Sequence, residues 1–318
     1  MEKKVLVMGG TGAMGRYLVP KLAQRGYQVD VVSLDQLPDQ KNIRYIQSDI
    51  MDDAVLEKQL LEGYDGIVDF MVYPTEHFKT RHKLLLENTD HYIFLSSYRV
   101  FADSNGQITE GSAQLLDVCR DAEFLASDDY SLKKCRGEDI LEQSVYENWT
   151  IVRPAITYSQ KRAQLVTLEL QHILAAMREN RPVLLPEAAR TVQATMTWAG
   201  DVAEMQARLL FDSSAKLQAF NVTTAEHNTW EQVAQIYKQV YGLSYEWVDT
   251  QTYLEAKAKN DKSGRVTKGS LWQLSYDRLY NRVMDNSKIL KQTGLKQQEL
   301  KSLYEGLLLE RDSNLEDL

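Results

Sequence analysis

The chain has 318 residues, and 43% of them are hydrophobic, which is enough for one large core or two coupled ones. Lysine and arginine total 37 against 45 aspartates and glutamates, and the net charge of -8 argues against nucleic acid as the main partner. Two cysteines and no apolar run of the roughly 20 residues that a membrane span needs argue against a disulfide framework, a structural zinc site and a membrane partner. We expect a globular protein without a metal, and the charged start at Met1–Lys4, which leads straight into a strand, predicts a cytoplasmic location.

Strand and helix patterns alternate through the first half of the chain. Hydrophobic runs predict strands at Val5–Met8, Val29–Val32, Arg44–Ile46, Ile67–Phe70, Tyr92–Leu95 and Thr150–Val152. Helical periodicity between them predicts helices near Tyr17–Arg25, Val55–Leu61 and Arg81–Glu87. This alternation is typical of the α/β class with a doubly wound parallel sheet and right-handed crossovers.

The second half is predicted to be less regular and mostly helical. A helical pattern runs from Leu165 to Arg178, breaks at Pro182 and Pro186, resumes briefly at Gln193–Trp198 and becomes helical again from Asp201. Polar residues and glycines predict a mobile loop at Lys257–Gly269, and Glu310–Leu318 is predicted to be a frayed acidic tail. We therefore assign residues 1–158 and 193–224 to the sheet, and residues 159–192 and 225–318 to a smaller substrate-binding part.

A glycine-rich turn stands between the first strand and the first helix. It reads Gly9-Gly10-Thr11-Gly12-Ala13-Met14-Gly15. Gly9 makes the tight turn, Gly12 lets backbone N–H groups approach a pyrophosphate, and Gly15 lets the helix pack closely on the strand. The N-terminus of that helix then faces the phosphate charge. Strand, turn and helix in this order predict a dinucleotide site in the sheet part.

A hydroxyl, a phenol and an amine follow at positions that suit acid-base chemistry. The strand at Tyr92–Leu95 ends at Ser96-Ser97, and ligands of open α/β sheets bind at that edge, where the Ser97 hydroxyl can bond a substrate oxygen. Tyr130 and Lys134 lie four residues apart, on one helical face. An ammonium near the phenol favours the phenolate and lowers the pKa of tyrosine from about 10 toward the working pH. We expect Ser97, Tyr130 and Lys134 to be catalytic.

The order of these motifs resembles that of the short-chain dehydrogenase/reductase superfamily. Further segments resemble its extended branch, the NAD-dependent epimerase/dehydratase family that acts on nucleotide sugars: Val100-Phe101, Arg153-Pro154, Gly200–Ala203, Phe220–Val222 and Trp230–Ala234. The resemblance implies a Rossmann-type fold, a nicotinamide cofactor and hydride transfer at a sugar carbon. It also implies a cofactor site made of Gly9, Gly12, Ala13, Met14, Gly15, Ser33, Asp35, Asp49, Ile50, Phe70, Met71, Tyr130, Lys134 and Pro154.

The end of the second strand bears on the choice between NAD and NADP. An acidic residue there accepts hydrogen bonds from the adenosine ribose, whereas a basic residue accommodates a 2′-phosphate. The stretch reads Val32-Ser33-Leu34-Asp35-Gln36, and no arginine or lysine lies between Gly26 and Gln40. We expect NAD, because the Asp35 carboxylate would repel the phosphate, although the sequence leaves NADP open.

Departures from the family pattern bear on the substrate. Many sugar-nucleotide enzymes hold a diphosphate with a basic residue at the position that matches Ala194, and Arg190 is the nearest substitute. Tyr98-Arg99 stands where the 4,6-dehydratases have an Asp-Glu pair, which disfavours a dehydratase of that kind. Tyr73 and Tyr98 lie near the expected active-site edge, as an auxiliary acid or as part of its wall.

Two classes of function follow from these observations. The first is an enzyme, most simply an epimerase of a nucleotide-linked sugar, although a reductase or dehydrogenase of another small carbonyl compound would use the same residues. The second is a non-catalytic dinucleotide- or RNA-binding protein, because the N-terminal half also resembles relatives that include the chloroplast stem-loop RNA-binding proteins. The intact catalytic set favours the enzyme, with a small-molecule substrate as its partner. The sequence leaves a homodimer open.

Overall fold

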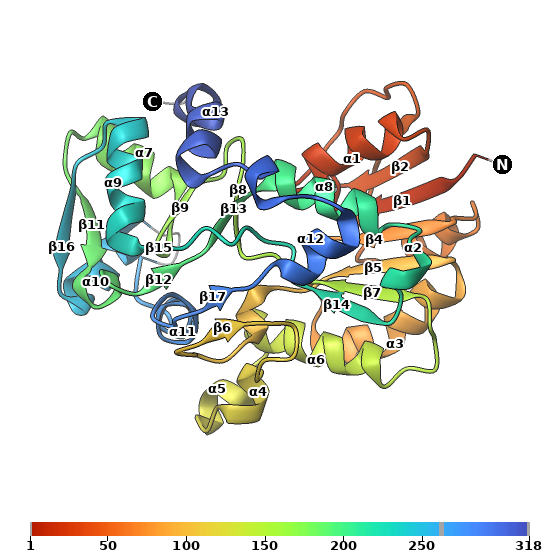
Figure 1. Ribbon diagram of the computed structural model, residues 1–318, viewed down its shortest axis with the longest axis horizontal. Helices are drawn as coiled ribbons and strands as arrows, with labels where there is room; N and C mark the ends of the chain where they lie inside the picture. The colour runs from red at the N-terminus through yellow and green to blue at the C-terminus, as the bar shows by residue number, and fades with distance from the viewer. Residues whose placement is uncertain (1, 261–263, 317–318) are drawn as a thin grey trace.

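A parallel sheet forms the centre of the larger part of the protein (Figure 1). The structure is a computed structural model that describes residues 2–260 and 264–316. Within these ranges seven strands form the sheet, in the spatial order β14 (Gln218–Phe220), β7 (Trp149–Val152), β5 (His91–Leu95), β4 (Gly66–Asp69), β1 (Lys4–Met8), β2 (Gln28–Ser33) and β3 (Ile43–Gln47). All neighbouring pairs are parallel. The chain winds outward from β1 in one direction and from β4 in the other, so the strand order reverses between them. The predicted α/β class is confirmed.

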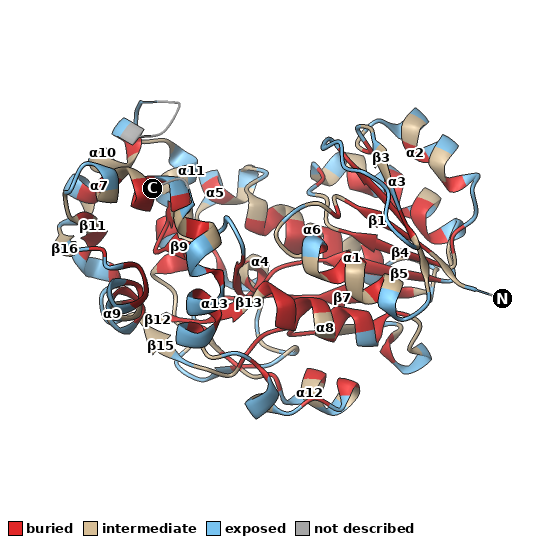
Figure 2. Ribbon diagram, turned by 90° about the horizontal axis from the view of Figure 1, so that it is seen from above, coloured by how far each residue is buried: buried red, intermediate tan, exposed pale blue. Residues whose placement is uncertain are grey.

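Helices cover both faces of the sheet. One face carries α1 (Gly15–Gln24), α8 (Ala199–Leu209) and α12 (Ser287–Thr293), and the other carries α2 (Asp53–Leu60), α3 (Thr75–Glu87) and α6 (Tyr130–Glu142). Alternation along β1 explains this, because Val5 and Val7 pack with the first set of helices while Leu6 and Met8 pack with the second. The central strands are accordingly buried on both sides (Figure 2).

Further helices and short paired strands lie outside the central sheet and its two helical layers. These helices include α7 (Leu170–Arg178), α9 (Trp230–Tyr241), α10 (Thr250–Asn260), α11 (Lys268–Gln273) and α13 (Leu303–Leu315). The strand pairs are β8 (Ile156–Tyr158) with β13 (Met196–Trp198), β9 (Gln164–Leu165) with β10 (Leu168–Glu169), β11 (Val183–Pro186) with β16 (Tyr245–Val248), β12 (Gln193–Ala194) with β15 (Asn228–Thr229), and β6 (Gln107–Ile108) with β17 (Val283–Met284). Two short helices, α4 (Leu115–Val118) and α5 (Ala122–Ala126), precede α6.

One predicted helix is shorter than expected, because residues far away in the sequence hold its first residues in another conformation. The helix expected from Leu165 begins only at Leu170, because residues 164–169 form the β9–β10 hairpin with Val166 in the left-handed region at φ 54°. The hairpin is held from elsewhere in the chain. The Val166 carbonyl accepts the Nε–H of Arg278 at 2.8 Å, and the Thr167 and Tyr253 hydroxyls lie 2.7 Å apart.

Two segments that were predicted to be irregular are helical in part, although residues 264–267 are irregular as predicted. Of the loop expected at Lys257–Gly269, the part up to Asn260 belongs to α10 and the part from Lys268 to α11, and residues 261–263 lie outside the described ranges. The expected frayed tail is helical through Leu315 in α13, and residues 317–318 lie outside the described ranges. Glu310 docks this helix, since its Oε1 accepts the Tyr17 hydroxyl at 2.6 Å and the Trp198 indole N–H at 2.8 Å.

Candidate active site

A cavity of about 410 Å³ opens at the carboxyl ends of the central strands, where the strand order reverses. Loops that follow β1, β4, β5 and β7 supply one wall, and residues of the smaller part supply the other. The lining residues expected from the sequence are Gly9, Gly12, Ala13, Met14, Gly15, Phe70, Ser97, Tyr98, Tyr130 and Pro154. The fold therefore brings the glycine turn, the serine and the tyrosine into one cavity.

The glycine turn leaves room for a ligand above the start of α1. Gly9 lies in the left-handed region at φ 74°, and its N–H donates to the Val32 carbonyl at 2.8 Å. A Cβ built on Gly12 would meet only the Gly9 carbonyl oxygen within 4 Å, at 3.4 Å, so a side chain there would occupy the cavity. A Cβ on Gly15 would lie 2.3 Å from the Gly10 carbonyl oxygen. The turn therefore has the shape that a pyrophosphate needs.

The ends of β2 and β3 supply the polar groups expected at the adenosine end. Thr11 of the glycine turn donates its hydroxyl to the Asp35 carboxylate at 2.6 Å, and the Asp35 N–H donates to the Ser33 hydroxyl at 3.2 Å. Asp49 accepts the Met51 N–H at 2.9 Å, and Ile50 is buried. Asp52, rather than Asp49, caps α2. These contacts fit an adenosine ribose beside the turn.

The residues after β4 divide between the cavity and the core. Phe70 lines the cavity, and the Met71 carbonyl accepts the Lys134 ammonium at 3.0 Å. Tyr73 instead is buried in the core, where its hydroxyl donates to Asp69 at 2.9 Å. The substrate contact expected of Tyr73 finds no support in this geometry, because the bond with Asp69 turns its hydroxyl inward.

Ser97 and Tyr130 each lie at the N-terminus of a helical segment, where local capping hydrogen bonds hold the backbone. Ser97 precedes the 3₁₀ turn η1 (Tyr98–Val100), and its hydroxyl oxygen accepts the Arg99 N–H at 3.2 Å. Tyr130 is the first residue of α6, whose N-cap Asp129 accepts the Ser131 N–H at 3.0 Å. Burial raises the pKa of Tyr130, while the Arg99 charge, the Ser97 side chain and the Arg162 charge lower it, in that order.

Lys134 lies one turn deeper along α6 and is buried. Its ammonium donates to the Leu95 carbonyl at 2.5 Å and to the Met71 carbonyl at 3.0 Å. Burial lowers the pKa of Lys134 to about 8, against the opposing effect of the Asp69 and Glu138 carboxylates. The amine thus joins the ends of β4 and β5 directly beside the expected catalytic pair.

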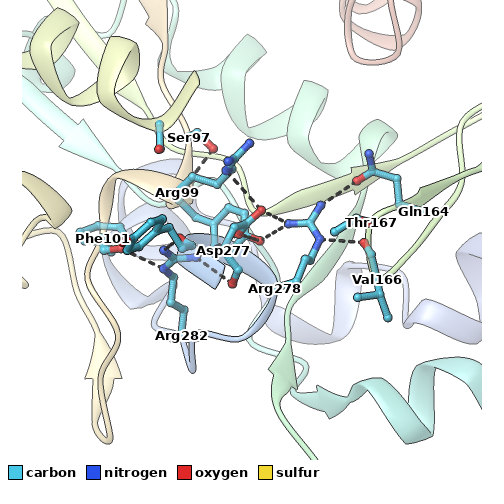
Figure 3. Close-up of polar contacts among 12 residues, drawn as sticks. Ser97, Arg99, Phe101, Gln164, Val166, Thr167, Asp277, Arg278 and Arg282 are labelled. Carbon is cyan, nitrogen blue, oxygen red and sulfur yellow. Dashed lines mark hydrogen bonds and ion pairs between the residues drawn. The ribbon is translucent and has the colours of Figure 1, made fainter. Parts of the chain in front are cut away.

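Three arginines gather around one buried carboxylate at the side of the cavity that faces the smaller part (Figure 3). Asp277 lies in a π-helical segment, η4 (Leu274–Arg278), and pairs with Arg99 at 3.2 Å, with Arg282 at 3.0 Å and with its neighbour Arg278. We call Asp277 and these three arginines the Asp277 cluster. Tyr98 lines the cavity with its hydroxyl committed to this cluster, as a 2.6 Å donor to Asp277.

Polar side chains for which the sequence predicted no role also line the cavity. They include three cationic residues, Arg99, Arg162 and Arg278, and two neutral ones, Gln164 and Gln273. Arg190, the expected diphosphate ligand, is absent from that lining and forms exposed ion pairs with Glu231 and Glu187. Proximity to Ser97 could have indicated Arg99, whereas Arg162 and Arg278 lie in segments without a recognisable motif.

Comparison with known proteins agrees with this fold. The sequence model of the NAD dependent epimerase/dehydratase family matches residues 5–223. The chain is 26% identical over 250 residues to the chloroplast stem-loop binding protein of 41 kDa b from Arabidopsis thaliana, an alignment that covers 73% of this chain and 62% of that protein. The chain thus spans less than two thirds of that relative's length.

Solved structures share the whole fold. UDP-glucose 4-epimerase from Thermotoga maritima, in a structure with UDP-glucose, has a TM-score of 0.70 and 18% identity over 99% of both chains. The dTDP-glucose 4,6-dehydratase of Bacillus anthracis, in complex with NAD, has a TM-score of 0.72 and 14% identity over 99% of this chain and 97% of its own. At these identities the likeness supports the fold alone.

Residues 2–260 and 264–316 were also compared with the requirements of a membrane-spanning helix and of a metal site. Every helix there is too short or too polar to serve as a transmembrane segment. No three histidine, cysteine, aspartate or glutamate side chains in these ranges gather in an arrangement that could hold a metal ion.

Proposed function

Because this chain belongs to the NAD dependent epimerase/dehydratase family, we propose that it interconverts or oxidises a nucleotide-linked sugar, most simply as an epimerase. The observation that carries the proposal is one cavity lined by the glycine turn, Ser97, Tyr130 and several arginines. The NAD cofactor expected from the sequence is confirmed by membership of an NAD-dependent family.

The open space over the glycine turn suits the pyrophosphate of NAD. The glycine turn would hold the pyrophosphate, Asp35 the adenosine ribose, and Lys134 the nicotinamide end beside Met71 and Leu95. NAD, when bound, supplies a hydride acceptor at that end.

Side chains of the protein transfer the proton of the sugar hydroxyl. Tyr130, as phenolate, takes the proton from a sugar hydroxyl, and the same phenol returns it when the carbonyl is reduced. The Ser97 side chain, which hydrogen-bonds Tyr130 in the unliganded cavity, would donate to the same sugar oxygen and keep that oxygen within reach of Tyr130. Reduction from the opposite face of the sugar carbon gives the epimer, whereas release of the oxidised sugar makes the protein a dehydrogenase.

The positive charge of the cavity lining supports an anionic substrate. Arg99, Arg162 and Arg278 line the cavity, whereas no aspartate or glutamate is among the described lining residues. Asp277 is shared by three arginines, and Asp129 pairs with Arg99 alone. A diphosphate suits an arginine-lined wall, because one guanidinium group can donate two parallel hydrogen bonds to the oxygens of a phosphate. We assign this role to Arg162 and Arg278, in place of Arg190.

The proposal is tested by incubating the purified protein and NAD with UDP-, dTDP- and GDP-linked hexoses and separating the isomers by chromatography. Conversion of at least one sugar nucleotide, lost in Tyr130→Phe, is the expected result. A protein that binds NAD but converts none of these and instead binds a stem-loop RNA would favour the non-catalytic alternative. That alternative draws on the Arabidopsis relative named for stem-loop binding and is disfavoured by the net charge of -8.

A further inference from the structure

A fully buried carboxylate lies beneath α6, the helix that carries Tyr130 and Lys134. It belongs to Asp69, the last residue of β4. Side chains two positions apart on a strand share a face of the sheet, and Ile67 packs in the core between the sheet and the helices α3 and α6. Asp69 therefore lies on the face of the sheet that α6 covers, and it is absent from the cavity lining.

Three groups donate hydrogen bonds to the Asp69 carboxylate. The Met71 N–H donates to Oδ1 at 2.8 Å, and the hydroxyls of Tyr73 and Tyr92 donate to Oδ2 at 2.9 and 2.6 Å. Burial raises the pKa of Asp69, whereas these three bonds and the Lys134 charge lower it. Burial and the Asp69 charge raise the pKa of both tyrosines well above the usual value, so the phenols stay protonated. Such a set of donors suits a carboxylate.

Met71 connects this carboxylate to Lys134. Its N–H is bonded to Asp69, and its carbonyl oxygen accepts the Lys134 ammonium at 3.0 Å. The ammonium also donates to the Leu95 carbonyl at 2.5 Å, and it lies 5.9 Å from the ring centroid of Tyr130. Asp69 thus fixes the backbone turn after β4 that holds the ammonium beside the phenol.

Two carboxylates favour the charged form of Lys134, and only one of them has charge to spare. Burial lowers the pKa of Lys134, while Asp69 first and Glu138 second raise it. The Arg153 guanidinium binds Glu138 at 2.9 and 2.6 Å and so neutralises its charge. Among the described residues Asp69 accepts hydrogen bonds from neutral groups only. Because a buried ammonium without an opposite charge loses its proton readily, Lys134 depends on Asp69.

We propose that Asp69 is the counter-charge that keeps Lys134 protonated and in place beside Tyr130. The inference rests on the roles that the proposed function gives to Tyr130 and Lys134. Asp69 acts through Lys134 and is therefore a positioning residue. Burial has already lowered the pKa of Lys134 to about 8, so loss of the Asp69 charge leaves a largely neutral amine just above neutral pH. A neutral amine neither favours the phenolate nor attracts the cofactor.

The other charged group on this face of the sheet has a partner of its own. The guanidinium carbon of Arg81, in α3, lies 5.2 Å from the ring centroid of Tyr73, and the guanidinium forms an ion pair with Asp53. Its charge is therefore matched on the side away from Asp69. The charges of Asp69 and Lys134 consequently depend on each other.

The test is a titration of the Lys134 amine in the full chain without added cofactor. Lysine labelled with ¹³C at Cε reports the ionisation by NMR, and Lys134→Met identifies the signal by its loss. Asp69→Asn keeps an oxygen that accepts the Met71 N–H and removes the charge. It is expected to lower the measured pKa of Lys134 by at least about one pH unit, because a nearby opposite charge shifts a pKa by about 1–3 units. An unchanged pKa would overturn the proposal.

Asp30→Asn is the matched control. Asp30 is a buried carboxylate of the same sheet that accepts the Tyr64 hydroxyl at 2.6 Å, but it lies in β2 and outside the cavity lining. The titration of Lys134 in this variant should match that of the wild type. A fall in Asp30→Asn as large as that in Asp69→Asn would refute a specific role of Asp69.

The pH dependence of NAD binding and of turnover gives a second readout. In Asp69→Asn the pH above which NAD affinity declines should move down together with the pKa of Lys134. An affinity that is reduced equally at every pH would show a merely structural role and overturn the proposal. An amine titration that moves while the pH profile of turnover stays in place would keep Asp69 as the counter-charge and refute the acid-base scheme of the proposed function.

A double variant keeps the proposal testable if Asp69→Asn alone does not fold. Asp69→Asn combined with Lys134→Met removes both buried charges, and it should therefore resist urea better than Asp69→Asn does. A double variant that is no more stable than Asp69→Asn would show that the two charges are not coupled and would overturn the proposal.

Discussion

The hydroxyl of Thr11 donates a 2.6 Å hydrogen bond to the carboxylate of Asp35, which joins the glycine turn to the end of β2. This contact fixes a negative charge at the edge where the adenosine ribose of the cofactor is expected. It also explains how an aspartate two residues beyond Ser33, the last residue of β2, reaches the position of an acidic ribose ligand.

The first prediction concerns cofactor preference. Asp35→Asn keeps an acceptor for Thr11 but removes the charge that repels a 2′-phosphate. The ratio of the Kd values for NADP and NAD is expected to fall by about five- to tenfold, because two unit charges about 4 Å apart in water repel by about 1 kcal/mol. Paired calorimetric titrations measure the ratio, and Asp39→Asn, a carboxylate that accepts the Tyr45 N–H instead, is the control. An unchanged ratio in Asp35→Asn would place the ribose elsewhere.

A second prediction concerns the glycine turn. Gly12→Val should abolish measurable NAD binding while the protein keeps its Tm within a few degrees, since the new Cβ points into the cavity and meets only one backbone atom. Gly111→Val adds the same side chain at an exposed glycine with open space around it and should bind NAD normally. Wild-type affinity in Gly12→Val would show that the pyrophosphate does not lie over this turn.

The third prediction is catalytic. Tyr130→Phe removes the transferable proton and leaves the ring in place, so turnover should drop by about 10²–10⁴-fold with NAD affinity retained. Tyr304→Phe makes the same change on α13, where the side chain is 44% exposed, and should leave turnover unaltered. Steady-state rates and NAD titrations of both variants are the measurements. A Tyr130→Phe rate close to wild type would remove this residue from the mechanism.

A fourth prediction concerns the stability of the Asp277 cluster. Asp277→Asn leaves the buried guanidinium groups of Arg278 and Arg282 without their carboxylate, which should lower the free energy of unfolding by about 3–5 kcal/mol. Glu76→Gln breaks an exposed ion pair with Lys79 and should cost less than about 1 kcal/mol. Urea unfolding of the two variants compares these values, and similar losses in both would mean that the cluster does not stabilise the fold.

The last prediction concerns pH. The imidazole Nδ1 of His91 accepts the Phe211 N–H at 2.8 Å, and Nε2 lies 2.8 Å from the Thr150 hydroxyl, which itself donates to the Ala215 carbonyl. This network needs the neutral ring, and burial lowers the pKa of His91 from 6.5 to about 4.

Between these two values the unfolded chain binds a proton that the folded chain does not. The free energy of unfolding should therefore fall as the pH drops from 6.5 toward about 4, and the His91 contribution to that fall is at most about 3 kcal/mol. Urea unfolding over this range should give a shallower dependence on pH in His91→Gln than in wild type. If the free energy of unfolding depends on pH equally in His91→Gln and in wild type, groups other than His91 cause the loss of stability.

The sequence by itself determined the sheet and the glycine turn that borders the cavity. Strands predicted at Val5–Met8 and Tyr92–Leu95 lie within one residue of β1 and β5, because buried parallel strands are continuous apolar runs that local composition reveals. The glycine turn and the Ser97, Tyr130 and Lys134 positions were predictable for a related reason. Each is a short motif whose chemistry depends on fixed spacing.

Only the tertiary structure decided which arginines line the cavity. Arg99, Arg162 and Arg278 come together from segments up to 179 positions apart, and the ion pairs with Asp277 that hold two of them have no periodicity in the sequence. The same cause docked Glu310 against Tyr17 and turned the expected start of α7 into a hairpin, which Arg278 holds through the Val166 carbonyl. In each case a buried polar group found its partner far away in the chain, and the free energy of that contact outweighs the local preference of the segment.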